Sequence, residues 1–126
     1  IVTQQKVKEL LAKRYQSQPG EPSAGCVFKN IKNAQFTEFI KNNPDIKLPA
    51  KFLKNQVIPA GWLIQECKLK GEKINGAQVS NTHANFIINF KDATAQDVVQ
   101  LISLAKNKVK EKFKINLEEE IQYLDF

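Results

Sequence analysis

A thiol, a cation and an amide stand close together in residues 25–30 of this chain. Gly25 lets a ligand approach the backbone closely, and Cys26 follows it directly with an ionisable proton. Lys29 and Asn30 then add a positive charge and a side-chain amide. Cys26 has two interpretations. It is either a reactive thiol of a site or a core residue, and a lone cysteine in an apolar strand is more often a core residue.

A run of three acidic residues, Glu118, Glu119 and Glu120, lies near the end of the chain. Such a run is usually a solvated edge. In a strand, however, Glu118 and Glu120 point to one side and Glu119 to the other, so that one side must face another part of the protein. A buried carboxyl of this set would have a raised pKa and could act as a general acid.

The remaining candidate ligands stand alone. His83 is the single histidine and falls in a polar turn between two expected strands. Such a histidine is more often a surface residue than a ligand, and without a second one we expect no metal site. Cys26 and Cys67 have no partner spacing for zinc or a redox motif, which is typical of free thiols in a reducing compartment.

Hydrophobic periodicity and turn residues predict the elements that position these side chains. We expect helices over residues 3–16, around Phe36, Phe39 and Ile40, over 59–67 and over 94–113. We expect strands in the centre of 23–30, at 74–80 and 85–90, and from about Glu118 to Leu124. The predicted fold class is α+β, with a small, mainly antiparallel sheet and about three helices packed on it.

Two helix ends carry local signals. Thr94 and Asp97 stand at the spacing of a capping box, with Asp in place of the usual Glu. Gly71 lies shortly after the helix expected at 59–67. It is a candidate for the residue that ends this helix in a left-handed backbone conformation. Pro44 and Pro49 predict irregular chain after the short helix that contains Phe36.

The 126 residues predict one domain of ordinary size, with 42% hydrophobic and 25% charged residues. Within it, we expect residues 1–18 to be a leading helix and connection, and residues 31–58 to be a surface excursion. The longest apolar runs are far too short to cross a bilayer.

A net charge of +6 arises from 19 Lys and Arg residues against 13 acidic ones. Such a domain could bind nucleic acid, an anionic membrane or a phosphorylated small molecule, or could simply carry a Lys-rich solvated surface. No segment interleaves aromatic and basic residues as an RNA-binding sheet does. A non-catalytic basic module for an anionic partner such as nucleic acid remains an alternative function, as does a structural domain that has lost its site.

Five segments, taken in their order and spacing, carry a resemblance to a known family. They are Arg14 to Pro19, Pro22 to Asn30, Ala60 to Ile64, Leu69 to Phe86 (through 69–71, 76–80 and 83–86), and Glu111 to Glu120 (through 111–113 and 117–120). Together they resemble the third, substrate-binding domain of the UDP-N-acetylenolpyruvoylglucosamine reductase family, known as MurB. The resemblance covers nearly the whole chain apart from residues 31–58.

The resemblance implies an NADPH-dependent, FAD-containing oxidoreductase of peptidoglycan precursor synthesis, and with it a role in cell wall biogenesis, cell shape and cell division. In that family NADPH reduces bound FAD, and the flavin passes hydride to UDP-N-acetylglucosamine enolpyruvate, which becomes UDP-N-acetylmuramate. The FAD-binding region of the family precedes this domain, and the chain contains no glycine-rich strand-to-helix turn. We therefore expect no cofactor bound to this chain alone and no activity without that region. The resemblance also implies a cytoplasmic protein that is monomeric at full length, with no nucleic-acid or membrane partner.

The family's proton donor is normally a serine directly after the glycine that matches Gly25, and in this chain Cys26 occupies that position. A thiol with a reference pKa of about 8.5 stays mostly protonated at neutral pH and is a far stronger acid than a serine hydroxyl. The resemblance assigns the second catalytic role to Glu120, which would assist the enolic intermediate.

The resemblance also implies a set of substrate-contacting residues around the Gly25 turn. Lys29 and Asn30 match positions associated with the diphosphate or sugar of the substrate. His83 matches a polar substrate-contacting position, and Arg14 and Gln18 match a segment that leads into the site.

Overall fold

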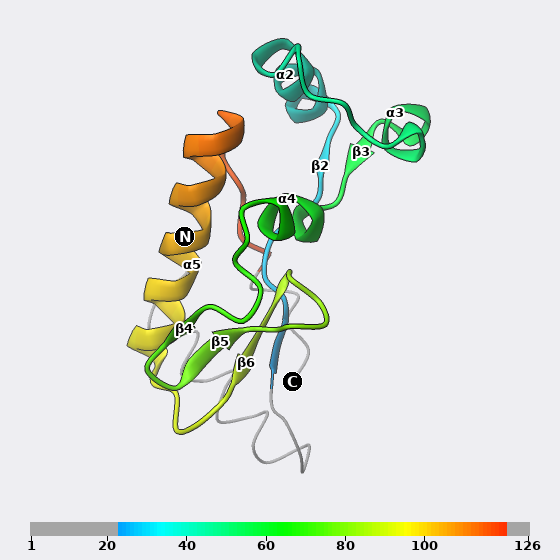
Figure 1. Cartoon of the computed structure of the whole chain (residues 1–126). Helices are drawn as coiled ribbons and strands as arrows, with labels where there is room; N and C mark the ends of the chain where they lie inside the picture. The colour runs from blue at the N-terminus through cyan, green and yellow to red at the C-terminus, as the bar shows by residue number, and fades with distance from the viewer. Residues whose placement is uncertain (1–22, 121–126) are drawn as a thin grey trace.

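The computed structural model describes residues 23–120 of the chain, and the side chains of residues 27–120 (Figure 1). The helix expected at 3–16, together with Arg14 and Gln18, lies outside the described residues. The described elements, in chain order, are β1 Ser23–Cys26, β2 Ile31–Lys32, α2 Ala34–Asn42, α3 Ala50–Asn55, β3 Val57–Ile58, α4 Ala60–Glu66, β4 Lys73–Ile74, β5 Ala77–Val79, β6 Phe86–Asn89 and α5 Ala95–Phe113.

The main sheet has four antiparallel strands in the order β1-β6-β5-β4. Cys26 at the end of β1 stands opposite Phe86 at the start of β6, and the register of this pair is irregular between Ser23 and Cys26. The turn between β4 and β5 requires Gly76, because a Cβ atom there would lie 1.9 Å from the carbonyl oxygen of Lys91. The strand predicted at 85–90 is confirmed as β6. The stretch predicted as one strand at 74–80 instead contains the end of β4, a turn at residues 75–76 and β5.

The long helix α5 packs against β4 and β5. Its capping box is present as predicted: the Thr94 side-chain oxygen accepts a hydrogen bond from the Asp97 backbone N–H at 3.1 Å, and the Thr94 N–H donates to the Asp97 carboxylate at 3.0 Å. The helix ends at Lys114, which has a φ of +58°. Its buried face consists of Asp97, Val98, Leu101, Ile102, Ala105, Val109 and Phe113.

The short helix α4 begins after Pro59, as expected. The residue that ends this helix in a left-handed backbone conformation is Lys68, with a φ of +59°, and not Gly71. The N–H of Leu69 returns to the carbonyl of Ile64 at 3.3 Å, which closes the helix before Gly71 is reached. Gly71 also has a positive φ, of 82°, but its N–H donates to Val79 at 2.9 Å, and it therefore serves the turn into the sheet.

Residues 31–58 form a second unit, which we call the ribbon: β2 and β3 pair as a two-stranded antiparallel sheet, and α2 and α3 stand at its outer end (Figure 1). The helix expected around Phe36 is confirmed as α2, and residues 43–49 contain no helix or strand. The expectation of irregular chain is wrong for residues 50–58, which form α3 and β3. These elements have only six and two residues, so their local signals are weak.

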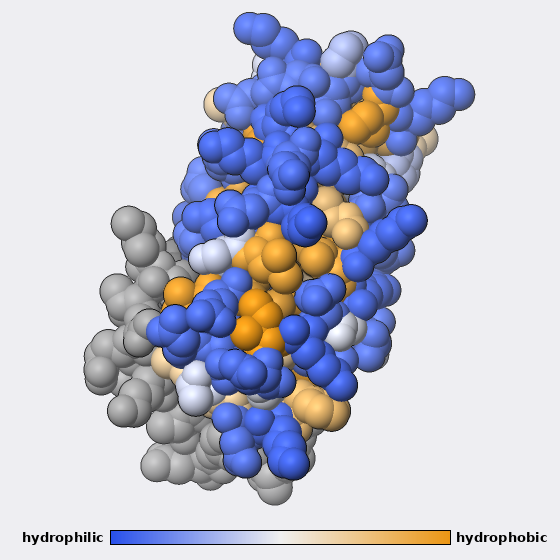
Figure 2. Space-filling view, turned by 60° about the vertical axis from the view of Figure 1, so that its left-hand side comes forward, coloured by the Kyte–Doolittle hydropathy of each residue, from blue (hydrophilic) through white to orange (hydrophobic). Residues whose placement is uncertain are grey.

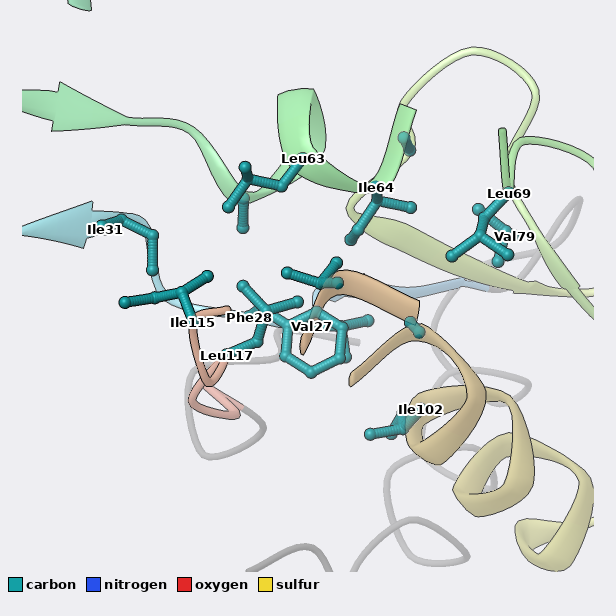
Figure 3. Packing of buried hydrophobic residues seen from close by; sticks show 14 of the residues in the cluster. Val27, Phe28, Ile31, Leu63, Ile64, Leu69, Val79, Ile102, Ile115 and Leu117 are labelled. Atoms are coloured by element: carbon teal, nitrogen blue, oxygen red, sulfur yellow. The ribbon is translucent and has the colours of Figure 1, made fainter. Parts of the chain in front are cut away.

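A single hydrophobic cluster joins the sheet, the ribbon and the helices. In Figure 3 the side chains of Val27 and Phe28 lie between residues of α4 on one side and the segment of Ile115 and Leu117 on the other. Ile31 and Ile58, a cross-strand pair of the ribbon, are both 0% exposed. The base of the ribbon is therefore part of the core.

The architecture confirms the α+β class with small antiparallel sheets, and residues 23–120 hold four helices where the pattern predicted three for the same stretch. None of the described helices combines the length and the apolar character needed to cross a membrane. Hydrophilic side chains cover most of the face that Figure 2 displays, and apolar side chains show between them.

Candidate functional site

A pocket of about 530 Å³ opens where the main sheet meets the base of the ribbon. Within the described part of the chain, its lining consists of Lys29, Asn30, Lys32, Val57 and Glu120. This volume falls within the range of ~300–1,000 Å³ typical of small-molecule sites. Three of the residues that the sequence singled out, at positions 29, 30 and 120, are thus brought to one pocket from segments 90 residues apart.

Backbone pairing between residues 27–29 and 118–120 creates this proximity. Phe28 and Glu119 form an antiparallel bridge. On either side of it, the Lys29 N–H donates to the carbonyl of Glu118 at 2.8 Å, and the Glu120 N–H donates to the carbonyl of Val27 at 2.7 Å. Residues 118–120 thereby align with the segment after β1; of the strand expected from Glu118 to Leu124, residues 121–124 lie outside the described residues.

Asn85 holds the other side of the same segment. Its side-chain oxygen accepts the Phe28 N–H at 3.0 Å, and its side-chain nitrogen donates to the Phe28 carbonyl at 2.9 Å. Its own carbonyl accepts the Val27 N–H at 2.9 Å. One amide thus replaces a strand partner for Phe28, whose side chain is 2% exposed, and fixes the backbone just before Lys29.

Asn30 has a structural contact in addition to its place in the pocket. Its side-chain oxygen accepts the backbone N–H of Ala60 at 3.0 Å. Ala60 is the first residue of α4, where backbone N–H groups lack partners within the helix. Asn30 therefore connects the lining of the pocket to the start of α4.

The three glutamates have different surroundings. Glu118 is exposed, Glu120 lines the pocket, and Glu119 pairs with Lys106 of α5 at 2.7 Å. Burial alone would raise the pKa of Glu119, but the hydrogen bond from Lys106, with its positive charge, and a backbone hydrogen bond together outweigh burial and lower that pKa. Glu119 is therefore held as a carboxylate by α5 and serves a structural pair, whereas Glu120 borders open space.

The other predicted site residues belong to β1, to the turn before β6 or to the part of the chain outside the described residues. Gly25 and Cys26 belong to the last residues of β1, directly before Val27, and the Cys26 side chain is not among those described. His83 is exposed in the turn before β6, and its ring lies 5.3 Å from that of Phe86. The backbone N–H of His83 donates to the Ser80 side-chain oxygen at 3.2 Å. It does not line the pocket of Lys29 and Glu120.

Cys67, at the end of α4, has different surroundings. It borders a shallow hollow of about 400 Å³ together with charged residues of α4 and α5. Burial raises the pKa of its thiol, and the positive charge of Lys112 offsets only part of this effect. The raised pKa favours the protonated thiol, which is the less reactive form. Within the described residues, no three His, Cys, Asp or Glu side chains gather in a way that could hold a metal ion.

Three contributors to the site were missed from the sequence. Lys32 and Val57 lie in the stretch that the family resemblance did not cover. Asn85 lies inside one of the resembling segments, but an asparagine before a strand has no local feature that reveals a hydrogen-bonded pair with residue 28. A long-range contact of this kind leaves no periodic signal.

Comparison with known proteins decides the family. Residues 17–124 match the family model described as UDP-N-acetylenolpyruvoylglucosamine reductase, C-terminal domain. The chain belongs to this family. The resemblance found in the sequence is thereby confirmed, and it is the C-terminal domain of MurB that the chain matches.

Individual MurB relatives agree with this assignment. The reductases of Syntrophobacter fumaroxidans and Chloroherpeton thalassium are each 41% identical over 94% of this chain, which corresponds to 28% and 33% of their own lengths. The reductase of Caldicellulosiruptor bescii is 42% identical over 95% of this chain and 31% of its own length. The chain thus spans about a third of the curated relatives it matches.

A crystal structure of the MurB reductase from Thermus caldophilus is 32% identical in sequence to this chain. The match covers 86% of this chain and 30% of that one, with a TM-score of 0.48. The three curated relatives carry the name of a reductase, which is an oxidoreductase.

Proposed function

We propose that this domain binds the UDP-sugar substrate of a MurB reductase and donates the proton that completes its reduction. The observation that carries the proposal is the single pocket shared by Lys29, Asn30 and Glu120. Family membership supports the identity of the substrate, UDP-N-acetylglucosamine enolpyruvate. The product would be UDP-N-acetylmuramate, a precursor of peptidoglycan, formed in the cytoplasm.

The polar groups of the pocket suit a phosphorylated sugar. Lys29 supplies a cation and Asn30 an amide, which are the groups that hold phosphate oxygens and sugar hydroxyls. Neither Lys29 nor Glu120 forms an ion pair with any residue of the described part, so both charges are available to a ligand. His83, Gln18 and Arg14 are retained as further candidate substrate contacts.

Reduction of the enolpyruvyl double bond adds a hydride to one carbon and a proton to its neighbour. Reduced FAD, regenerated by NADPH, supplies the hydride when it is bound. In the family the flavin belongs to a region other than this domain, so the complete activity is proposed for a protein that also contains that region. The residues of this chain would bind and orient the substrate and move the proton.

Cys26 is the proposed proton donor. Its backbone directly precedes Val27, whose carbonyl accepts the Glu120 N–H at 2.7 Å, so Cys26 and Glu120 belong to adjacent backbone segments. Glu120 would assist the enolic intermediate near its carboxylate while the Cys26 thiol delivers its proton to carbon. Transfer of a proton by a positioned side chain accelerates a reaction by roughly 10²–10⁴-fold.

Binding is tested on this chain by chemical-shift titration with UDP-N-acetylglucosamine. We expect shifts that cluster at the backbone amides of Cys26, Lys29, Asn30 and Glu120. A lack of response at millimolar ligand, or shifts confined to the exposed lysines of α5, would contradict substrate binding at this pocket. Mixed DNA serves as the comparison ligand, because a nucleic-acid module would respond to it with a steep salt dependence.

Proton donation is tested in a protein that also carries the flavin-binding region. Cys26→Ala should reduce product formation by about 10²-fold or more while leaving flavin reduction by NADPH nearly intact. Cys26→Ser, which restores the residue usual in the family, should keep activity. Normal turnover by Cys26→Ala would show that another group donates the proton.

A further inference from the structure

We propose that Lys32, on strand β2 of the ribbon, is a second cation for the diphosphate of the substrate, beside Lys29. This inference rests on the proposed substrate binding and adds to it a residue from a part of the chain that the family resemblance did not cover. It makes the ribbon a wall of the binding site rather than a surface excursion.

The pocket itself is the first argument. Lys32 and its cross-strand partner Val57 both line it, so the ribbon presents one face to the space that Lys29 and Glu120 border. Among the described residues, the lining contains two lysines and one carboxylate. A positive excess of this kind favours an anionic group, and a diphosphate carries more than one negative charge for the two lysines to contact.

The two lysines are also available for a ligand. Lys32 is exposed and Lys29 is half-buried, and neither forms an ion pair within residues 27–120. By contrast, Lys106 on α5 is already paired with Glu119. Glu120 offsets part of the positive charge of the pocket, but no described carboxylate forms an ion pair with either lysine.

The ribbon is held firmly enough to position Lys32. The residue before Lys32, Ile31, is completely buried against the core, as is its partner Ile58. Just outside the ribbon's base, Asn30 is tied to the start of α4. A cation on such a fixed strand loses less conformational freedom on binding than one on a mobile loop.

The test measures the affinity of this chain for UDP and for uridine by titration calorimetry or chemical shift. Lys32→Ala should weaken UDP binding about tenfold, as expected for loss of one charge-assisted contact. Its effect on uridine, which lacks phosphate, should stay within about twofold. Lys32→Arg should keep most of the UDP affinity, because it keeps the positive charge.

The matched control is Lys54→Ala. Lys54 is an exposed lysine on α3, in the same ribbon, and does not line the pocket. Removal of its charge should change UDP affinity by less than about twofold in 0.1 M salt, because exposed charges are screened over about 10 Å. Because Lys32 is exposed, its replacement is expected to leave the fold intact, and an unchanged amide spectrum verifies this.

The outcomes separate the two proposals. If UDP binds, Lys29→Ala weakens it, and Lys32→Ala does not, the role of Lys32 is wrong and substrate binding stands. Equal losses in Lys32→Ala and Lys54→Ala would also overturn it, because they would indicate a general effect of net charge. If UDP does not bind to the unchanged chain, both proposals fail.

Discussion

The four-stranded sheet with α5 and the two-stranded ribbon differ in the source of their order. The sheet region uses signals that are local in sequence, such as the capping box of Thr94 and Asp97 and the buried stripe along α5. The ribbon has two-residue strands and a six-residue α3 without a buried residue. Elements this short are ordered by contacts with distant parts of the chain, not by their own propensities.

Those contacts are visible at the end of α5, where backbone carbonyls lack partners within the helix. Side chains from the ribbon supply hydrogen bonds there: Asn43 donates to the carbonyl of Phe113 at 2.6 Å, and Asn42 to that of Lys114 at 3.1 Å. The rings of Phe39 and Phe113 lie 5.7 Å apart, and Trp62 of α4 lies 6.0 Å from Phe113. The ribbon and α5 therefore stabilise one another.

The largest expected effect comes from Phe39→Ala in α2. Phe39 is 0% exposed and packs on Phe113, so its truncation should lower the free energy of unfolding by about 3–5 kcal/mol. Unfolding in urea should be followed by far-UV circular dichroism, to which α5 contributes more than any other described helix. It should also be followed by the fluorescence of Trp62, the single tryptophan, whose ring contacts Phe52 of the ribbon and Phe113 of α5.

If the ribbon and α5 form one cooperative unit, both signals change together in the parent chain and in Phe39→Ala. Leu53→Ala on α3 is the matched control, because Leu53 is 51% exposed and its truncation should cost little. A loss of the fluorescence transition alone, with α5 unaffected, would show that the ribbon folds as an independent and dispensable unit.

A smaller effect is expected for Asn85→Ala in the sheet region. The substitution leaves the buried N–H and carbonyl of Phe28 without the partners that Asn85 supplies, which should cost about 1–3 kcal/mol. Thermal unfolding measures the loss, with Asn81→Ala, exposed in the same turn, as the control. A change no larger than that of Asn81→Ala would mean that water replaces the amide without cost.

The smallest effect concerns Asp97 and is dependent on pH. Hydrogen bonds from the backbone and side chain of Thr94 and from Asn75 lower the pKa of Asp97 below its ordinary value, although burial opposes them. A depressed pKa in the folded state stabilises the protein fully above the unfolded pKa of about 3.9, and this contribution is lost as pH falls further, through the folded pKa.

Asp97→Asn should therefore lower the free energy of unfolding at pH 7 by about 0.5–2 kcal/mol, and its deficit should shrink below pH 4. Urea unfolding at pH 7 and pH 3 measures this difference. The comparable substitution at Asp45, exposed in the turn after α2, should have little effect at pH 7. A deficit for Asp97→Asn that grows toward low pH would contradict a depressed pKa for this carboxyl.

The sequence was informative where one element contained its own signals. The capping box predicted the start of α5 to the residue, and Pro59 predicted the start of α4. It was less informative at Gly71, because glycine merely permits a left-handed conformation and the backbone of Lys68 adopted it first. It failed for residues 50–58, where Phe52 is ordered by an edge-on contact with the ring of Trp62.

For the candidate site, the sequence by itself determined which chemical groups are present: a thiol after Gly25, a lysine and an amide at 29 and 30, and a late run of glutamates. Family motifs joined these groups into one expected site. Only the tertiary structure brought Glu120 beside Lys29, separated Glu119 toward α5, and added Lys32 and Val57 from the ribbon. The physical reason is that residue types and spacings specify local conformation, whereas pairing across 90 residues is decided by hydrogen bonds and core packing between distant segments.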